Sequence, residues 1–256
     1  MRAVGIIPAR LESQRLPRKP VADIFGSMLI ERVYAQALKS KELSEVYLTS
    51  DSTEIEAIAV EKGLNFIKTG SHHITGTERV AEAYEILTKS GKDFDMVLNV
   101  QGDMPFINPK LIDGNISLFR ALKGKADMVT PCTPIFDINE YERPASVKVV
   151  IGKDNRALYF SRAPIPFLRN PEERMKDEPF SYKHMGLYVF SPSVLKQVAK
   201  LSIELPESRE KLEQLRLLAH GFSIYCYVAA IEETHPSIEV DTPEDLQRAI
   251  EFAKTL

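Results

Sequence analysis

The sequence contains only two cysteines in 256 residues. Cys132 and Cys226 stand far apart in the chain, whereas a metal knuckle or a redox pair needs cysteines a few residues apart. A disulfide framework is typical of much smaller secreted domains. We therefore expect both thiols to be reduced.

The sequence also lacks a surplus of charge and a long apolar run. The net charge at pH 7 is -3, so the composition indicates neither nucleic acid nor a membrane surface as a partner. No stretch approaches the ~20 apolar residues that span a bilayer. The apolar run in MRAVGIIPAR is too short for a signal peptide, and Arg10 interrupts it. These absences predict a cytoplasmic protein.

The composition of the sequence is that of a globular protein, and its patterns predict alternating strands and helices. Hydrophobic residues make up 44% of the chain, which is enough for one compact domain. Apolar runs predict strands at 3–8, 45–50, 64–67 and 96–100, and helical spacing predicts helices at 28–40, 52–62 and 77–89. This alternation indicates parallel βαβ units and a sheet covered on both faces.

The middle of the chain has strands with little helix between them. The predicted strands are 127–136, 147–152, 156–161 and 183–191, with a long loop over 163–179. Beyond them we predict a helix at 207–221, a strand at 222–230 and a last helix that is capped by Thr242. The simplest organisation is a single domain over 1–256 with an inserted β-rich lobe at about 130–190.

The segment PARLESQRLPRKP follows the first strand directly and carries Arg10, Arg15, Arg18 and Lys19. Ligands of open α/β sheets bind beyond the carboxyl ends of the strands, and guanidinium groups grip phosphate oxygens in pairs. The segment therefore predicts a polyphosphate site. It is not a Walker loop, because GxxxxGK[ST] is absent. A solvated basic loop is the alternative that the residues alone leave open.

Two aspartates follow apolar stretches and are candidate metal ligands. Asp103 lies just beyond the strand at 96–100, and Asp241 lies in IEVDTPEDL. Proteins commonly bind Mg²⁺ through one or two carboxylates together with substrate phosphates. We predict that both aspartates hold Mg²⁺. An ordinary turn residue at 103, and an acid favoured before a helix at 241, are the alternatives.

Eight short blocks occur in order along the chain: PAR-x4-RLP-x-KP, TGTER, NVQGD, VKVV, ALYFSR, YKHMGLY, LEQLR-x-L and VDTPEDL. Together they resemble the 3-deoxy-manno-octulosonate cytidylyltransferases, the CMP-Kdo synthetase family, from about residue 3 to 250. Several blocks are weak alone, whereas their order and joint presence are specific. The first loop lacks the GG pair of sugar-1-phosphate nucleotidyltransferases.

The resemblance implies an α/β fold of the Rossmann-like nucleotidyltransferase kind, with a mixed sheet and helices on both faces. It implies transfer of CMP from CTP to the eight-carbon acidic sugar Kdo, with release of pyrophosphate. It also implies Mg²⁺ as cofactor, a homodimer, and a place in lipopolysaccharide biosynthesis.

The resemblance further implies roles for individual residues. The catalytic set is Arg10, Arg15, Lys19, Asp103 and Asp241, of which the last two are the metal ligands. The CTP site comprises Pro8, Ala9, Arg10, Ser13, Arg15, Lys19, Thr75, Arg79, Gln101 and Asp103. The sugar pocket comprises Gln101, Arg162, Arg169, His184, Tyr188, Glu213, Gln214 and Glu239. Without the resemblance, His184 would be interpreted as a satisfied core histidine.

Three positions depart from the commonest pattern of the family. Arg18 stands where Gly is usual, which makes a positive φ unexpected there, and Met104 stands where Glu or Gln is usual. Glu239 stands where Gly is common and puts an acid near the expected sugar. A buried carboxylate needs a partner, so 8-amino-Kdo is an alternative acceptor. Solvent exposure or a nearby Lys or Arg would satisfy Glu239 equally.

Two further alternatives stay open. One is the same reaction on another nonulosonic acid. The other is a nucleotide-binding protein that has kept the fold without catalysis.

Overall fold

A computed structural model of the chain describes residues 1–13, 15–170 and 178–256. Part of the predicted loop at 163–179 therefore lies outside the described residues. The elements in chain order are β1 (Ala3–Pro8), η1 (Lys19–Val21), α1 (Leu29–Ala37), β2 (Leu43–Ser50), α2 (Thr53–Glu61), β3 (Phe66–Lys68), α3 (Gly76–Lys89), β4 (Met96–Val100), α4 (Pro109–Ala121), β5 (Met128–Ile135), α5 (Ile138–Glu142), β6 (Lys148–Ile151), β7 (Ala157–Ser161), β8 (Ser181–His184), β9 (Leu187–Phe190), α6 (Pro192–Val198), α7 (Leu205–Glu210), α8 (Gln214–Ala219), β10 (Ile224–Val228), α9 (Ile231–Thr234) and α10 (Pro243–Ala253).

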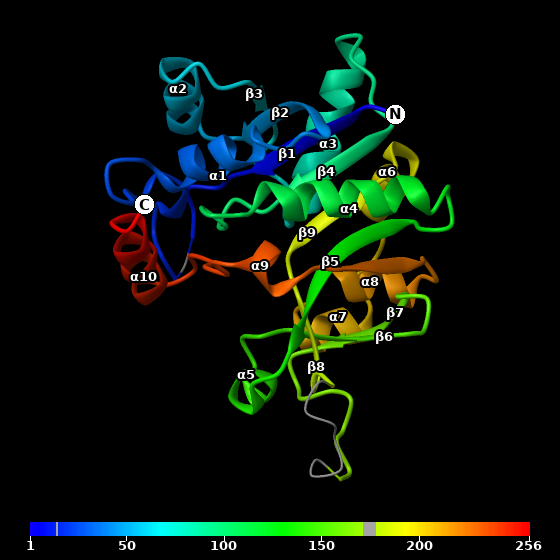
Figure 1. Cartoon of the computed structure of the whole chain (residues 1–256). Helices are drawn as coiled ribbons and strands as arrows, with labels where there is room; N and C mark the ends of the chain where they lie inside the picture. The colour runs from blue at the N-terminus through cyan, green and yellow to red at the C-terminus, as the bar shows by residue number, and fades with distance from the viewer. Residues whose placement is uncertain (14, 171–177) are drawn as a thin grey trace.

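The strands form one ten-stranded sheet in the order β3-β2-β1-β4-β9-β5-β8-β6-β7, with β10 paired to β5 (Figure 1). The strands β3, β2, β1 and β4 are parallel to one another. Strand β9 is antiparallel to both β4 and β5, and β10 is parallel to β5. The predicted mixed α/β sheet is therefore confirmed. All the predicted lobe strands belong to this same sheet, and the division into domain and lobe stays a prediction.

Alternate side chains of β1 enter two different cores, because successive residues of a strand point to opposite faces. Val4 and Ile6 pack in a cluster with apolar residues of α3 and α6. Ala3 and Ile7 pack in another cluster with residues of α1, α2 and α4. Helices thus cover both faces of the sheet, as predicted. The carboxyl ends of β1 and β4 are left free to carry a site.

Two elements differ from the prediction in the sheet region. The strand expected at 183–191 is interrupted at Met185 and Gly186, so that β8 pairs with β5 and β6 whereas β9 pairs with β4 and β5. Helix α4 is absent from the predicted elements, although Asn108 caps it and Pro109 opens it. An Asn at the N-cap followed by Pro at the first helical position is a common helix start, so the sequence did carry a signal for α4.

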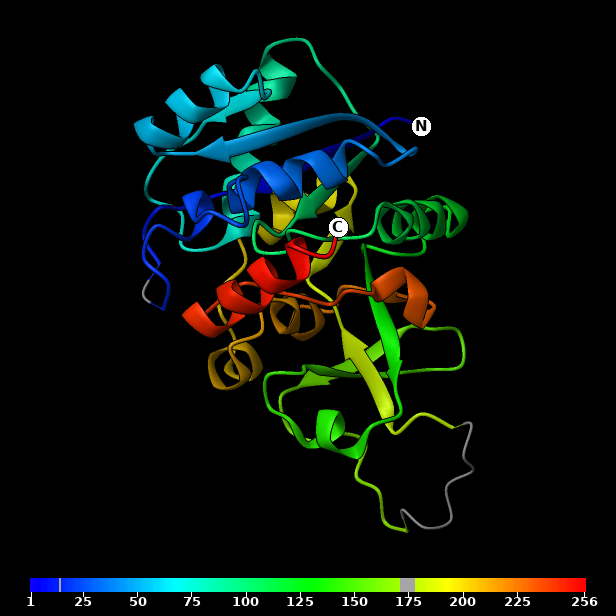
Figure 2. The same ribbon diagram turned by 60° about the vertical axis from the view of Figure 1, so that its left-hand side comes forward.

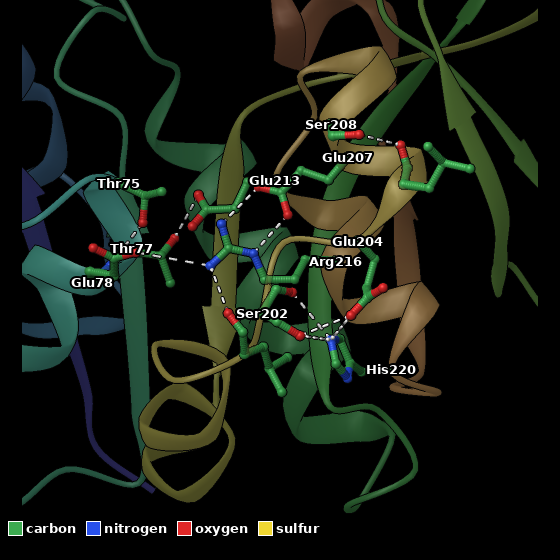
Figure 3. Close-up of polar contacts among 12 residues, drawn as sticks. Thr75, Thr77, Glu78, Ser202, Glu204, Glu207, Ser208, Glu213, Arg216 and His220 are labelled. Carbon is green, nitrogen blue, oxygen red and sulfur yellow. Dashed lines mark hydrogen bonds and ion pairs between the residues drawn. The ribbon is translucent and has the colours of Figure 1, made fainter.

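The predicted helix at 207–221 is two helices, α7 and α8. Lys211 ends α7 in the left-handed conformation at φ 56°, which a continuous helix cannot contain. The Arg216 side chain, 2% exposed, joins the two helices by donating from Nε and Nη2 to the two Glu207 carboxylate oxygens, each at 2.7 Å. Figure 3 shows Arg216 between Glu207 and Glu78. This buried pair holds the bend and so positions the start of α8.

The last helix, α10, brings the end of the chain back to its beginning. Thr242 caps α10 and forms a capping box with Asp245, as predicted. Apolar residues of α10 pack in a third cluster with Leu16 and Ile24 from the segment after β1. Figure 2 shows α10 beside that segment. Asp241, which precedes α10, is thereby carried to the first loop. None of the described helices is both long and apolar enough to cross a lipid bilayer.

We expect Arg216→Ala to lower the free energy of unfolding by ~3–5 kcal/mol, because it leaves the Glu207 carboxylate buried without its partner. Urea denaturation measures this change. Arg209→Ala, on the exposed surface of α7, is the matched control and should change stability by no more than ~0.5 kcal/mol. Equal stability of the two variants would contradict the role given to the buried pair.

Candidate active site

The first loop sends its cations in two directions. Arg10, Arg15 and Lys19 line a cavity of about 690 Å³ at the end of β1. Arg18 instead donates to the Glu54 carboxylate of α2, at 3.0 Å from Nη1. Arg18 also has φ 58°, so the expectation that a side chain there disfavours positive φ was wrong. In this conformation the Arg18 side chain reaches α2, where its charge is paired.

Lys19 connects the two predicted metal ligands. Its Nζ lies 3.3 Å from Oδ2 of Asp103 and 2.9 Å from Oδ1 of Asp241. Arg15 Nη2 lies 3.1 Å from the other Asp241 oxygen. The backbone N–H of Val240 donates to the carbonyl of Asp103 at 2.9 Å. The structure therefore brings together carboxylates that are widely separated in the chain.

Gly102 allows the aspartates to meet because it lets the ends of β1 and β4 approach each other closely. A Cβ at Gly102 would come within 2.9 Å of the Pro8 carbonyl oxygen. Only glycine lets the turn after β4 lie against the end of β1 at this distance. Asp103 is consequently held beside the first loop.

The acidic centre has the electrostatics expected of a cation site. Burial raises the pKa of the Asp103 carboxyl, and the charge of Asp241 raises it further against the opposing effect of Lys19. Burial lowers the pKa of Lys19, but the two aspartates outweigh burial and the pKa is raised. Carboxylate oxygens are the ligands that Mg²⁺ prefers, so Asp103 and Asp241 fit the metal that the resemblance implies.

Asp103 and Asp241 lie between two cavities. The cavity at the first loop is lined by Pro8, Ala9, Arg10, Ser13, Arg15, Lys19 and Gln101, among others. A second cavity of about 800 Å³ lies on the other side. Arg15, Gln101, Asp103 and Asp241 line both cavities. A metal held by the two aspartates would therefore face both.

On the side of the first loop, two guanidinium groups have nitrogens without partners among the described residues. They are Nη2 of Arg10 and Nε of Arg79, and both atoms are buried. The other Arg79 nitrogens bond to Thr69, to Gly70 and to Asp51. Burial lowers the pKa of Arg79. A buried donor without an acceptor is costly, so an anionic or carbonyl-bearing ligand fits beside Arg10, which lines the cavity. Arg79 is not among the described lining residues of either cavity, and its contact with a nucleotide stays a prediction.

Thr75 was predicted to contact the nucleotide but lies outside both cavity linings. It caps α3, and its hydroxyl accepts from the Glu78 N–H at 3.2 Å. Its neighbour Ile74 does line the cavity. The structure thus gives Thr75 a capping role, and its contact with a nucleotide stays a prediction.

Seven of the eight residues predicted for the sugar line the larger cavity: Gln101, Arg162, His184, Tyr188, Glu213, Gln214 and Glu239. Arg169 is not among its described lining residues and lies exposed in the loop after β7. Arg143, Lys183 and Arg248 also line the cavity and were not predicted. Arg143 and Arg248 lie outside the recognised blocks, whereas Lys183 lies within YKHMGLY, next to the predicted His184.

His184 is buried, and both of its ring nitrogens have partners. Nε2 lies 2.9 Å from the Thr130 hydroxyl, and that hydroxyl donates to the Met185 carbonyl. The Thr130 hydroxyl is therefore assigned as the acceptor of a hydrogen bond from the His184 Nε2–H, which leaves Nδ1 to accept from the Gln214 amide at 3.4 Å. The Tyr188 ring stacks on His184 with centroids 5.7 Å apart. The satisfied core histidine expected from the residues alone also lines the cavity.

Glu213 and Gln214, which are adjacent at the start of α8, contact different residues, because neighbouring side chains of a helix point about 100° apart. Gln214 contacts His184, whereas the Glu213 carboxylate accepts from the Thr77 hydroxyl at 3.0 Å. Burial raises the pKa of Glu213. Arg162 donates from Nε to the Glu210 carbonyl at 3.0 Å rather than to a carboxylate. This bond fixes the Arg162 side chain at the cavity wall.

Known proteins share this arrangement along almost the whole chain. The sequence model of the Cytidylyltransferase family matches residues 4–225. A 3-deoxy-manno-octulosonate cytidylyltransferase of Phocaeicola vulgatus is 40% identical, over 99% of this chain and 98% of that protein. A protein of the same name from Chlorobium limicola is 42% identical, over 96% and 95% of the two chains. This chain belongs to the 3-deoxy-manno-octulosonate cytidylyltransferase family.

Solved structures agree with this assignment. A CMP:2-keto-3-deoxy-manno-octonic acid synthetase in complex with CTP matches with a TM-score of 0.88 at 35% identity, over 100% of both chains. A cytidylyltransferase from Leptospira borgpetersenii, at 17% identity and a TM-score of 0.63, shares the fold. The predicted nucleotidyltransferase fold and the prediction of an enzyme are therefore confirmed.

Two of the family departures face the larger cavity of this cytidylyltransferase. Met104 is buried and also belongs to the core beneath the site. Glu239 lies in the irregular segment between α9 and α10. Burial among the cavity walls, together with the charge of Asp103, raises the pKa of Glu239 to about 7, and the positive charge of Lys183 opposes this. The Lys183 ammonium itself pairs with Glu140 at 3.0 Å, so it acts on Glu239 through its charge and not as a direct ion-pair partner.

His184 should make the stability of the cytidylyltransferase depend on pH. Burial lowers the pKa of His184 from 6.5 to about 3. Between these two pH values the imidazole is protonated in the unfolded chain and neutral in the folded protein. The stabilisation is complete above about pH 6.5 and is lost as the pH falls towards about 3, by up to about 1.4 kcal/mol per pH unit.

Urea denaturation between about pH 7 and about pH 5 measures this slope. His184→Gln should flatten it, whereas the exposed His235 offers His235→Gln as the matched control. An unchanged slope in His184→Gln would reject a neutral buried imidazole.

Proposed function

We propose that this cytidylyltransferase transfers CMP from CTP to the anomeric hydroxyl of Kdo and releases pyrophosphate. The observation that carries the proposal is the pair Asp103 and Asp241, which line both a cation-rich cavity at the first loop and a second cavity with further cations. A triphosphate fits the first cavity and an acidic sugar fits the second. The family name and the CTP-bound relative support the same pairing.

The reaction is an in-line displacement at the α-phosphorus of CTP. A bond forms between the anomeric oxygen and phosphorus, the bond to the β-phosphate oxygen breaks, and pyrophosphate leaves with the electron pair. The hydroxyl proton passes to solvent. Positioning and stabilisation of charge can carry such a step without a covalent intermediate.

The side chains of the first loop supply the positive charge for this step. Arg10 lines this cavity and has a buried Nη2 without a partner among the described residues, a donor that a phosphate oxygen would satisfy. Arg15 and Lys19, which bond to the aspartates, line the same cavity. On the sugar side, Arg162, Arg143 and Lys183 place positive charge where a substrate carboxylate would lie.

Mg²⁺ is the proposed cofactor, held by Asp103 and Asp241. When bound, it would neutralise phosphate charge and lower the pKa of the attacking hydroxyl. The surplus of acid at this centre supports a bound cation, since Glu239 adds a third carboxylate beside one lysine and one arginine. The homodimer, the cytoplasmic location and the place in lipopolysaccharide biosynthesis stay predictions.

The alternatives are weaker. The relatives are named for Kdo and do not favour 8-amino-Kdo or another nonulosonic acid. Lys183 offers Glu239 a positive charge without any amino group on the substrate. A non-catalytic protein would not need Lys19, Asp103 and Asp241 in contact at the junction of two cavities.

We expect Asp103→Asn to slow Mg²⁺-dependent pyrophosphate release from CTP and Kdo at least about 100-fold, because it removes a negative ligand at the reacting phosphate. Asp154→Asn, in the exposed turn between β6 and β7, is the control and should be unaffected. Chelation should stop the reaction and Mg²⁺ should restore it. A normal rate in Asp103→Asn would refute the assignment of this ligand, and a rate indifferent to chelation would refute the metal.

We expect kcat/KM with Kdo to equal or exceed kcat/KM with 8-amino-Kdo, since the positive charge of Lys183 already acts on the Glu239 carboxylate. Initial rates with both acceptors at saturating CTP measure the ratio. Glu239→Gln should shift the ratio by less than about tenfold, which is less than 1.4 kcal/mol. A clear preference for the amino sugar that disappears in Glu239→Gln would establish the alternative acceptor instead.

A further inference from the structure

A cluster of possible metal ligands lies away from the acidic centre, between β3 and α3. Its members are His72, His73 and Glu82. One ligand atom from each lies within 4.8 Å of the others. No other trio of His, Cys, Asp or Glu in the described part of the chain meets this criterion. The catalytic mechanism uses none of the three.

The cluster is half enclosed by the protein. The His73 side chain is 7% exposed, and its Nε2 lies 2.5 Å from Oε2 of Glu82. The His72 and His73 rings lie side by side, with centroids 4.2 Å apart at an angle of 40°. His72 is exposed. An ion held here would therefore keep one side open to solvent.

The backbone at Gly70 shapes the cluster. Its N–H donates to the Glu82 carboxylate at 2.8 Å and so orients this ligand. A Cβ at Gly70 would lie only 2.5 Å from Nδ1 of His72. Only glycine therefore lets His72 fold back over this residue. A hydrogen bond to a ligating carboxylate is a common support of metal sites.

The ligand chemistry selects the kind of ion. Two imidazoles and one carboxylate form a donor set that suits Zn²⁺ and its neighbours, with water in the remaining position. Mg²⁺ prefers an all-oxygen shell, so this cluster is chemically distinct from the aspartate pair. We propose that His72, His73 and Glu82 form a Zn²⁺ site that ties the 70–75 segment to α3.

The position of the cluster gives such an ion a role. The same segment contributes Ile74 to the cavity at the first loop. Arg79, one turn before Glu82, donates to the Gly70 carbonyl at 3.2 Å. An ion joining both sides of this contact holds the nucleotide side of the site together. Occupancy should therefore act on the KM for CTP more than on kcat.

The test is titration of the full chain, freed of metal by chelation, with Co²⁺ as a spectroscopic stand-in and with Zn²⁺ by calorimetry. One ion per chain is expected, with d–d absorption typical of mixed imidazole and carboxylate ligation. His72→Ala and Glu82→Gln should each weaken binding at least about tenfold, since each removes a ligand. Thermal unfolding without metal shows that each variant is folded.

The matched control is His220→Ala. His220 also lies beside a carboxylate, with Nε2 3.5 Å from Glu204 Oε1, and beside Ser202 (Figure 3). It belongs to no described trio, so its loss should leave binding unchanged. Asp103→Asn should likewise leave the Co²⁺ spectrum unchanged.

Three results would overturn the proposal: no saturable binding, equal binding in folded His72→Ala and Glu82→Gln, or loss of the spectrum in Asp103→Asn. The last would mean that the ion sits on the catalytic aspartates. None of these outcomes bears on CMP transfer, which Asp103→Asn tests through pyrophosphate release.

Discussion

The ammonium group of Lys19, placed between the carboxylates of Asp103 and Asp241, is the interaction on which the site depends. It joins the first loop, the end of β4 and the approach to α10. Two carboxylates this close to each other in a partly buried setting would repel without a cation between them. The Val240 backbone hydrogen bond and the packing of α10 on Leu16 reinforce the same junction. Substrate phosphates and a metal would meet the protein at this junction.

The walls around this centre are held by ion pairs that two buried arginines form. Arg79 bonds to Asp51 and supports the segment that leads into α3. Arg216 bonds to Glu207 and supports the bend that leads into α8. Both arginines are almost fully buried, where a partner is required for charge. These two ion pairs thus hold segments that lead into helices beside the two cavities.

The strands and the segments around the aspartates could be predicted, because apolar runs and capping signals are local, whereas the mixed sheet was implied by the family resemblance. Predictions failed where the backbone left its preferred path. Arg18 and Lys211 both adopt positive φ without being glycine, which no propensity favours. The interruption at Gly186 depends on which strands lie beside β8 and β9. Arg143 and Arg248 could not be found as cavity residues, since neither belongs to a motif.

The sequence by itself determined the chemistry that is available: a cationic loop after the first strand, two aspartates after apolar stretches, and a family pattern along the chain. These are properties of residue type and spacing, and they do not depend on distant contacts. Only the tertiary structure decided that one lysine joins both aspartates, that Arg18 turns away to Glu54, and that His72, His73 and Glu82 converge. Such contacts arise from how β1, β4, α3 and α10 pack, and local sequence carries no signal for them.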